Sequence, residues 1–384
     1  MNILHIAPYY PSKNAKHAGG VTMGNEVETL RALGHKVYSL SFVQEKHDYD
    51  IYRTEKKESD FAIKIDGKRK FINFLKHPLS PIGIATRIDS RFEKLVNEYL
   101  EKYKIDCIHA EYSSMLWLVK MKKKYDVKFI VVLHDVVAQS CQRKVVTNDN
   151  LIKKFFYKME LIKVKRYERK FLSKCDVIMS FSDKDKKLIK NMYGQDSLRI
   201  NLFYDFDYIK KARELYCRKK DGFTAIFFMG QMGRKANSDA ALRLIKIFSN
   251  LKMENTKLYV IGANPSDALL KSAGDDVVIT GFVENIEKFI IENCDVGCFP
   301  LLNGAGVKIK VLESLILGVP VITNEIGAEG IDEKGEYLIL AEKDQEFEQR
   351  IRDVIEMKIH KDPCLLQDFS WDVTKNVFRN VYVG

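Results

Sequence analysis

Short runs of β-forming residues alternate with longer amphipathic stretches along nearly the whole chain. In the first half, apolar runs such as Ile3–Pro8, Lys36–Phe42 and Lys128–His134 are separated by stretches with helical spacing of their apolar residues. The pattern restarts after a polar, charged stretch, Lys210–Asp221, beginning with the apolar run Ala225–Met229. Such alternation is typical of parallel sheets covered by helices on both faces. We therefore predict an α/β protein with two Rossmann-like, doubly wound domains that face each other across a cleft.

The same two periodicities predict the remaining elements. The other expected strands are rich in apolar residues and cover 106–109, 176–182, 199–203, 258–261, 277–280, 296–299, 319–323 and 337–340. The expected helices have amphipathic spacing and cover 21–33, 83–104, 113–125, 149–173, 183–193, 237–251, 265–273, 285–293, 307–317 and 343–359. Ser182 precedes Asp183-Lys184-Asp185, which predicts a helix N-cap there. Domain boundaries are placed at 1–205 and 206–365, with a tail at 366–384 that ends in helix.

The charge balance indicates an anionic partner. Lys and Arg total 63 and Asp and Glu total 52, which gives a formal charge of 63 − 52 = +11. A nucleic acid, a lipid surface or a phosphorylated small molecule would each satisfy this charge. The 46% hydrophobic and 30% charged composition excludes wholesale disorder.

Cysteine usage and the amino-terminal sequence favour a cytoplasmic protein. The seven cysteines include no CxxC pair, so we expect buried, reduced thiols and no metal centre. The amino-terminal run MNILHIAPYYP lacks a basic segment and is predicted to be a strand, not a signal peptide. No apolar run approaches the ~18 residues of a membrane-spanning helix. Any membrane contact is therefore expected to be peripheral, on the inner face of the plasma membrane.

A Gly-rich turn at Gly304–Gly306 joins a predicted strand to a helix expected to begin near Val307. Backbone N–H groups at a helix start favour an anion, and glycine lets the backbone approach a phosphate closely. Lys308 and Lys310 add positive charge where it opposes the helix dipole, which an anion would explain. A diphosphate at the amides of Gly304, Gly306 and Val307 would place Glu313 near a ribose diol. The alternative interpretation is that the glycines only form a loop and Glu313 is a solvated helix residue.

The chain resembles a known family at this point. The segment 298–331, CFPLLNGAGVKIKVLESLILGVPVITNEIGAEGI, is similar to the carboxy-terminal signature of the family 4 glycosyltransferases (glycosyl transferases group 1), which have the GT-B fold. Residues 6–37 resemble the family's first strand, Gly-rich loop and first helix. Residues 227–245 and 277–300 resemble two parts of its nucleotide-sugar domain, and 368–378 its closing helix, which returns to the amino-terminal domain. Residues 45–80 match no part of the family that we can name.

The resemblance implies a retaining transfer of sugar from a nucleotide-sugar donor. The family's E-x7-E motif places its ribose-binding Glu on Glu313, and its first Glu falls on Ala305. The donor phosphates would contact Arg234, Lys235 and Lys308. No cofactor is expected, because the UDP- or GDP-linked sugar is the substrate. The departing phosphate oxygen itself would take the acceptor proton, so no side-chain nucleophile is expected.

The resemblance also implies roles for four further residues. Gly20 would let the loop of the first domain approach the donor phosphates. Phe282 and Val283 would border the base. His134, at the end of its predicted strand, would lie beside the donor sugar, whereas its position alone is equally consistent with a structural histidine.

Two other signals leave alternatives open. Asp205-Phe206-Asp207 is a DxD sequence of the kind that binds divalent metals, but a three-residue pattern is common and none is expected to be bound. The basic, aromatic stretch 153–171 is either a solvated helix face or a contact with an anionic membrane surface. Nucleic-acid binding is not expected, because no recognition motif accompanies the charge.

The leading hypothesis is transfer to a glycan or lipid-linked acceptor in bacterial surface polysaccharide synthesis. A nucleotide-sugar epimerase or hydrolase on the same fold is the first alternative. The second is a non-catalytic protein that binds sugars or lipid surfaces.

Overall fold

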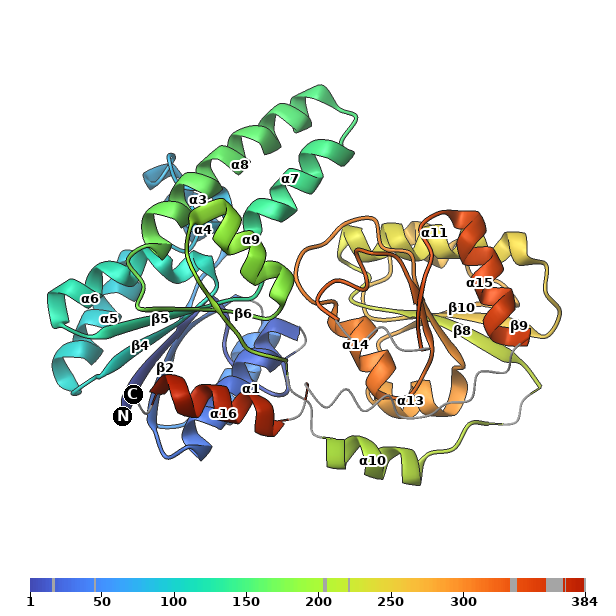
Figure 1. Cartoon of the computed structure of the whole chain (residues 1–384), viewed down its shortest axis with the longest axis horizontal. Helices are drawn as coiled ribbons and strands as arrows, with labels where there is room; N and C mark the ends of the chain where they lie inside the picture. The colour runs from blue at the N-terminus through green and yellow to red at the C-terminus, as the bar shows by residue number, and fades with distance from the viewer. Residues whose placement is uncertain are drawn as a thin grey trace. The chain divides into compact units, whose positions relative to one another are not determined.

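The computed structural model describes residues 1–15, 18–44, 46–202, 206–219, 222–331, 337–356, 369 and 371–382. The chain divides into two compact units: unit 1 is Met1–Phe203 with Trp371–Gly384, and unit 2 is Tyr204–Ser370. Each unit contains a parallel sheet with helices packed against it (Figure 1). This architecture confirms the predicted fold class.

The described part of unit 1 holds a seven-stranded parallel sheet in the order β3-β2-β1-β4-β5-β6-β7. The strands are β1 (Asn2–Ala7), β2 (Lys36–Val43), β3 (Asp60–Lys64), β4 (Cys107–Glu111), β5 (Lys128–Leu133), β6 (Val177–Ser180) and β7 (Leu198–Arg199). The helices are α1 (Ala18–Ala32), α2 (Lys46–Glu55), α3 (Gly67–Lys76), α4 (Ile82–Ala85), α5 (Ser90–Lys102), α6 (Lys120–Tyr125), α7 (Val137–Thr147), α8 (Leu151–Leu172), α9 (Asp183–Tyr193) and α16 (Trp371–Tyr382), with the 3₁₀ helix η1 (Ser113–Val119).

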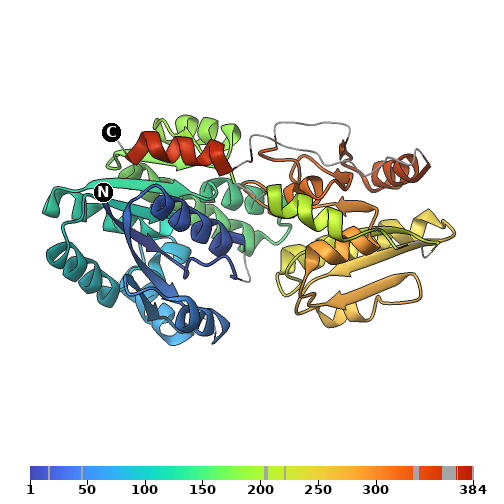
Figure 2. The same ribbon diagram turned by 90° about the horizontal axis from the view of Figure 1, so that it is seen from below.

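Side chains along β1 alternate between the two faces of the sheet of unit 1. Leu4 and Ile6 join an apolar core with α5, where Phe42 and Phe92 stack with ring centroids 4.4 Å apart. His5 points to the opposite face, which α1 and α16 cover (Figures 1 and 2). Successive residues of a strand face opposite sides of the sheet, so one polar residue in an apolar strand marks a polar site on one face only.

The described part of unit 2 holds a six-stranded parallel sheet in the order β10-β9-β8-β11-β12-β13. The strands are β8 (Thr224–Met229), β9 (Thr256–Ile261), β10 (Val277–Gly281), β11 (Val296–Phe299), β12 (Val321–Thr323) and β13 (Leu338–Leu340). The helices are α10 (Phe206–Leu215), α11 (Lys235–Leu251), α12 (Asp267–Leu270), α13 (Ile286–Asn293), α14 (Ile309–Ile316) and α15 (Asp344–Glu356).

Strand order places a switch point in each unit. In unit 1, β1 lies between β2 and β4; in unit 2, β8 lies between β9 and β11. The strand order reverses at such a strand, so the connections on its two sides run away from each other. This leaves a crevice at the carboxyl ends of the strands. Functional groups are therefore expected after β1, β4 and β5, and after β8 and β11.

Several elements differ from the sequence expectations. β3, α2 and α3 fall where no element was predicted, since DFAIK is too mixed to stand out as a strand and Phe61 is exposed. The polar stretch at the junction contains the helix α10, and the segment 113–125 begins as η1 and continues as α6. The N-cap prediction is confirmed, because the Ser182 side chain accepts a hydrogen bond from Asp185 N.

The cysteines are only partly as expected. The six that lie in the described residues form no disulfide. Cys107, Cys294 and Cys298 are buried, but Cys217 is exposed, which corrects the expectation of uniformly buried thiols. Within the described ranges, no helix combines the length and apolar character needed to cross a bilayer.

Candidate functional site

The turn after β11 is built around two glycines. Gly306 has a φ of +69°, in the left-handed region that favours glycine. The helix α14 starts at Ile309, two residues later than the sequence suggested, so Lys308 is its N-cap and not part of its first turn. The N-cap side chain gives no hydrogen bond to the first turn of α14. The start of this helix therefore lacks the capping that usually satisfies its N–H groups.

Lys308 folds back over the turn. Its Nζ donates to the carbonyl of Gly306 and lies 3.3 Å from Oε2 of the buried Glu329. Its Cε lies 2.6 Å from the position that a Cβ at Gly304 would occupy. The absence of a side chain at Gly304 thus makes room for the aliphatic part of Lys308. Ala305 offers no carboxylate to this turn, and Glu329, which follows β12, supplies one instead.

Lys310 is a cation near the end of β8 with no carboxylate partner. Its Nζ donates to Asn237 Oδ1 over 2.7 Å and lies 4.6 Å from the ring centre of Phe228. Nζ is also 2.7 Å from the position of a Cβ at Gly230. Within the described residues, no carboxylate lies within ion-pair distance of it. Burial, with repulsion from Arg234, lowers the pKa of Lys310 to about 7, as expected for a cation that lacks an anion.

Glu313 lies one turn further along α14. Burial, with repulsion from Glu287, raises the pKa of its carboxyl to about 8, although Lys310 acts in the opposite direction. A carboxyl group held in this way is stabilised by hydrogen-bond donors such as hydroxyl groups. The structure thus places Glu313, the residue predicted to bind the ribose, near Lys310.

The other predicted donor-site residues lie at the same edge of the sheet of unit 2 or next to it. Arg234 is the N-cap residue of α11, which follows β8. Lys235 points along its own helix, where its Nζ pairs with Asp239 at 2.8 Å. Phe282 and Val283 directly follow β10, and the Phe282 side chain is 68% exposed. An exposed aromatic ring at a strand end offers a stacking surface for a planar base.

In unit 1, His134 directly follows β5 and is held on two sides. Its Nε2 lies 2.8 Å from Oε2 of Glu111, and its ring stacks on Tyr112 with centroids 3.8 Å apart. Tyr112 has a positive φ of 63°, which is strained for a residue with a Cβ. Such strain is common at functional sites, and here it sets the ring that supports His134.

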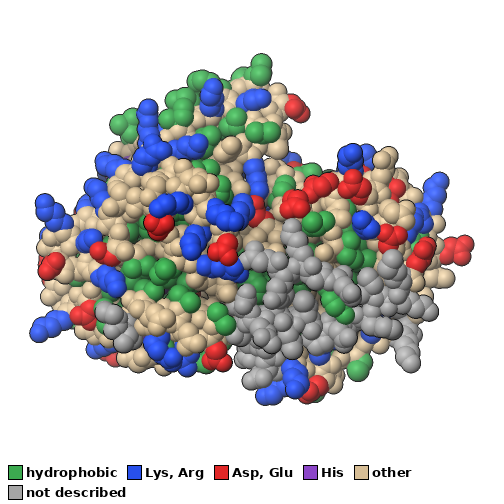
Figure 3. All heavy atoms as spheres, in the orientation of Figure 1, with side chains coloured by type: hydrophobic (Ala, Val, Ile, Leu, Met, Phe, Trp, Pro, Cys, Tyr) green, Lys and Arg blue, Asp and Glu red, His purple; other side chains and the backbone are tan. Residues whose placement is uncertain are grey.

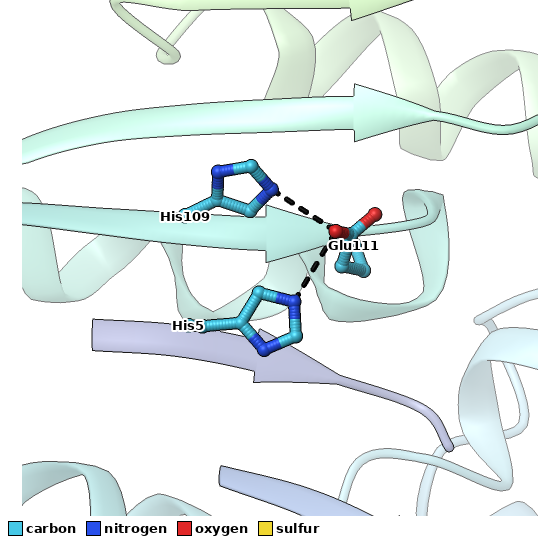
Figure 4. A group of neighbouring side chains, drawn as sticks. All are labelled: His5, His109 and Glu111. Atoms are coloured by element: carbon cyan, nitrogen blue, oxygen red, sulfur yellow. Dashed lines mark hydrogen bonds and ion pairs between the residues drawn. The ribbon is translucent and has the colours of Figure 1, made fainter. Parts of the chain in front are cut away.

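Glu111 is the centre of a buried group of histidines that sequence reasoning missed (Figure 4). Its Oε1 accepts from Nε2 of His5 at 3.2 Å and of His109 at 3.0 Å. Burial alone would raise the pKa of Glu111, but the hydrogen bonds from His109, His134 and His5 hold it well below its ordinary value. The signal was present in the sequence, since His5, His109 and Glu111 interrupt otherwise apolar strands at positions on one face.

Glu26 of α1 completes this group. Its Oε2 lies 3.4 Å from Nε2 of His109, and burial with repulsion from Glu111 raises its pKa to about 7. Burial would lower the pKa of His109, but Glu111 and Glu26 outweigh it and raise the pKa to about 9. Imidazole and carboxylate are also metal ligands, and the ligand atoms of His5, His109 and Glu111 lie within 4.8 Å of one another. The distances above are hydrogen-bond distances, so the histidines satisfy Glu111 directly.

Two predicted positions are placed differently or lie outside the description. Gly20 is in the first turn of α1 and not in the preceding loop, and its carbonyl accepts a hydrogen bond from Ser12 N over 3.1 Å. The loop also passes close to Gly24, where a Cβ would lie 2.6 Å from the Ser12 carbonyl carbon. Of the DxD sequence, Asp205 lies outside the described residues, as do the side chains of the two residues that follow it.

Two sequence families match the chain. A family described as Glycosyltransferase Family 4 matches residues 19–205, and one described as Glycosyl transferases group 1 matches residues 224–357. A search of curated proteins found no significant match.

Solved structures share the fold over almost the full length. Sucrose-phosphate synthase from Thermosynechococcus elongatus aligns with 100% of this chain and 98% of its own, with a TM-score of 0.73 and 13% identity. HepE from Anabaena, in complex with UDP, aligns over 100% of both chains with a TM-score of 0.70 and 12% identity. A glycosyltransferase from Rickettsia africae covers 99% of this chain and 97% of its own, with a TM-score of 0.66 and 17% identity. At these identities the likeness establishes the two-domain GT-B fold.

Proposed function

Because the chain belongs to the group 1, family 4 glycosyltransferases of the GT-B fold, we propose that it moves a sugar from a nucleoside-diphosphate sugar to a glycan or lipid-linked acceptor. The observation that supports the donor class best is the unpaired cation Lys310 beside the uncapped start of α14. Together they offer backbone amides and a positive charge to a diphosphate. Glu313, one turn further on, offers a carboxyl group to the ribose.

In this proposal unit 2 stabilises the leaving group. The bond between the sugar C1 and the phosphate oxygen breaks, and negative charge develops on the diphosphate. Lys310, Arg234 and the amides of the Gly304–Val307 turn interact more strongly with that charge as it grows, which is the condition for catalysis. The acceptor oxygen bonds to C1 on the face that the phosphate left, and its proton passes to the departing phosphate oxygen. The configuration at C1 is then retained without a side-chain nucleophile.

We assign the groups that handle the sugar and the acceptor to unit 1. His134, fixed by Glu111 and Tyr112, has a defined ring orientation. Arg87 supports an acceptor with an anionic group: its guanidinium lies 5.3 Å from the ring centre of Tyr9, which follows β1. Arg87 is buried, and its Nη1 has no hydrogen-bond partner among the described residues. A phosphate or carboxylate of the acceptor would satisfy it.

A thermal-shift screen tests the donor class. UDP, GDP, ADP and their sugars would be added to the full chain, with UDP first because the similar HepE structures contain UDP and UDP-glucose. A ligand at 100 times its Kd should raise the melting temperature by about 5 °C. Slow release of the nucleotide from its sugar would then indicate an enzyme and not a binding protein. No shift with any nucleotide would contradict the proposal.

We expect activity to persist in EDTA. Lys310, Arg234 and backbone amides supply the charge that a divalent ion would otherwise supply to the diphosphate. The measurement is nucleotide release from the donor before and after dialysis against EDTA. Loss of activity that Mn²⁺ restores would instead indicate a metal-dependent reaction.

Glu111→Gln is expected to lower turnover by about 10- to 100-fold, because a misplaced His134 ring loses its alignment with the reacting atoms. UDP affinity should stay within about twofold, since the proposed nucleotide site lies in unit 2, and this also checks that the variant folds. The double variant with His134→Ala should be no slower than His134→Ala alone, because Glu111 acts through that ring. Additive losses would show that Glu111 does not act by positioning His134.

A further inference from the structure

The first half of α8 exposes an apolar face. We define this α8 face by its exposed apolar side chains: Leu151, Ile152, Phe155, Phe156, Met159 and Ile162. Leu151 is 79% exposed and Ile152 is 81% exposed. Large apolar side chains exposed next to each other are uncommon on monomeric soluble proteins and mark interaction surfaces.

Helical geometry separates the α8 face from the side of α8 that packs on unit 1. At roughly 100° per residue, its six residues fall within an arc of about 140°. The buried residues Val164, Tyr167 and Leu172 fall on a different arc, which faces the core. The α8 face is thus not an extension of the core, and the folding of unit 1 does not require it.

Lysines border this face. Lys154, Lys158 and Lys165 fall on the arc next to Leu151, and the first two are exposed. Figure 3 shows hydrophobic and basic side chains gathered together over α7 and α8. An apolar stripe with lysines along its border is the arrangement of helices that lie in the interface of an anionic membrane.

Neighbouring elements extend the same surface. Val146, near the end of α7, is 74% exposed, and α7 packs against α8 to form a hairpin (Figure 1). The loop that carries the exposed Leu79 is tied to α8, since Lys163 Nζ donates to Pro78 O over 2.9 Å and Glu160 accepts from Ile82 N over 2.9 Å. Apolar side chains from two parts of the sequence thus adjoin the α8 face.

We propose that the α8 face docks on an anionic lipid bilayer, with its apolar side chains in the headgroup region and Lys154 and Lys158 against the lipid phosphates. The charge complementarity favours lipid over a second copy of the chain, which would bring the same lysines together. The exposed apolar area favours lipid over nucleic acid, whose backbone is bound by charge alone. This surface goes beyond the proposed sugar transfer and does not depend on it. It also moves the predicted contact from the whole stretch 153–171 to its amino-terminal half and the end of α7.

Vesicle flotation with the full chain tests the apolar contact. The wild-type protein should float with phosphatidylcholine vesicles that contain about 30% phosphatidylglycerol, because anionic lipid attracts basic side chains. Much less protein should float with vesicles of pure phosphatidylcholine. Ile152→Glu with Phe155→Glu should reduce binding by about tenfold or more, because apolar area leaves the interface. Leu215→Glu with Leu270→Glu is the matched control: these two leucines of unit 2 are 75% and 51% exposed, and their substitution should leave binding unchanged.

A second pair of variants tests the charge. Each lysine near an anionic surface contributes about fivefold to binding, so Lys154→Gln with Lys158→Gln should lose about 25-fold. Lys246→Gln with Lys271→Gln, two exposed lysines of unit 2, removes the same charge elsewhere and should have little effect. Wild-type protein that ignores anionic vesicles, or equal losses in both pairs, would overturn the proposal. So would sedimentation that shows a lipid-free dimer which Ile152→Glu with Phe155→Glu dissociates.

Discussion

Lys310→Met should weaken UDP binding by roughly 10- to 150-fold, the range expected for losing a hydrogen bond between charged groups. The methionine keeps the length of the side chain and its packing on Phe228, but removes the cation next to Gly230. Isothermal titration calorimetry on the full chain measures the change. Lys246→Met, an exposed lysine of α11, is the matched control and should bind UDP like the wild type.

The pKa of Lys310 adds a pH signature to this prediction. Burial lowers it to about 7, so the lysine is largely neutral in the free protein above that pH. A diphosphate favours the charged form, so UDP binding at pH 8 should take up a proton, and affinity should fall as the pH rises above 7. Titrations in two buffers with different ionisation heats measure the uptake. If Lys310→Met binds UDP with unchanged affinity and unchanged proton uptake, the diphosphate lies elsewhere.

Glu313→Ala should weaken UDP binding by about two- to tenfold, because the ribose hydroxyls lose the carboxyl group that hydrogen-bonds with them, an interaction of about 0.5–1.5 kcal/mol for an uncharged group. Glu313→Gln keeps the shape of the side chain and should fall between the alanine variant and the wild type. Calorimetry with UDP measures both variants. Unchanged affinity of a folded Glu313→Ala protein would remove the ribose assignment.

The same residue predicts an effect on stability in the absence of nucleotide. The pKa of Glu313 is raised in the folded protein to about 8, so folding favours its protonated form. Ionising this buried carboxyl lowers the free energy of unfolding. That loss of stability is absent below the unfolded pKa near 4.5 and grows as the pH rises from there toward 8. Glu313→Gln removes this loss, so the variant should melt at a higher temperature than the wild type at pH 8 and at nearly the same temperature at pH 4.5. Equal melting temperatures at both values would contradict the buried carboxyl.

The donor side of the candidate site could be predicted from local sequence because its groups lie close together in the chain. The Gly304–Gly306 turn, Lys308 and Glu313 all fall within one turn and one short helix, whose geometry is regular. Even there, local reasoning gave Lys308 a place in the first turn of the helix, whereas its side chain folds back to Glu329. It also treated Lys310 only as added positive charge for an anion, because its partner Asn237 lies in α11 and the close Gly230 directly follows β8.

The histidine cluster could not be predicted in the same way. His5, Glu26 and Glu111 are far apart in the sequence, and only the pairing of β1 with β4 and the packing of α1 bring them together. The buried surroundings then determine their charge states. Two buried glutamates differ in direction, since the pKa of Glu26 is raised and that of Glu111 is lowered. Those shifts depend on which donors each carboxylate meets, and a sequence pattern contains no distances between distant segments.

Periodicity alone was enough for the α/β class and for most strands and helices of each half, because these follow from backbone geometry and the burial of apolar residues at fixed spacing. The Gly-rich turn was recognised from its own residues, whereas the order of the strands within each sheet came from the structure. Three further features could be seen only in the folded structure. They are the lack of a carboxylate partner for Lys310, the hydrogen bond between Glu111 and His134, and the exposure of one apolar side of α8. Each depends on which surfaces are covered by segments distant in the chain. A helix with two apolar sides reads the same in sequence whichever side packs on the core, and only packing shows which one is left to the solvent.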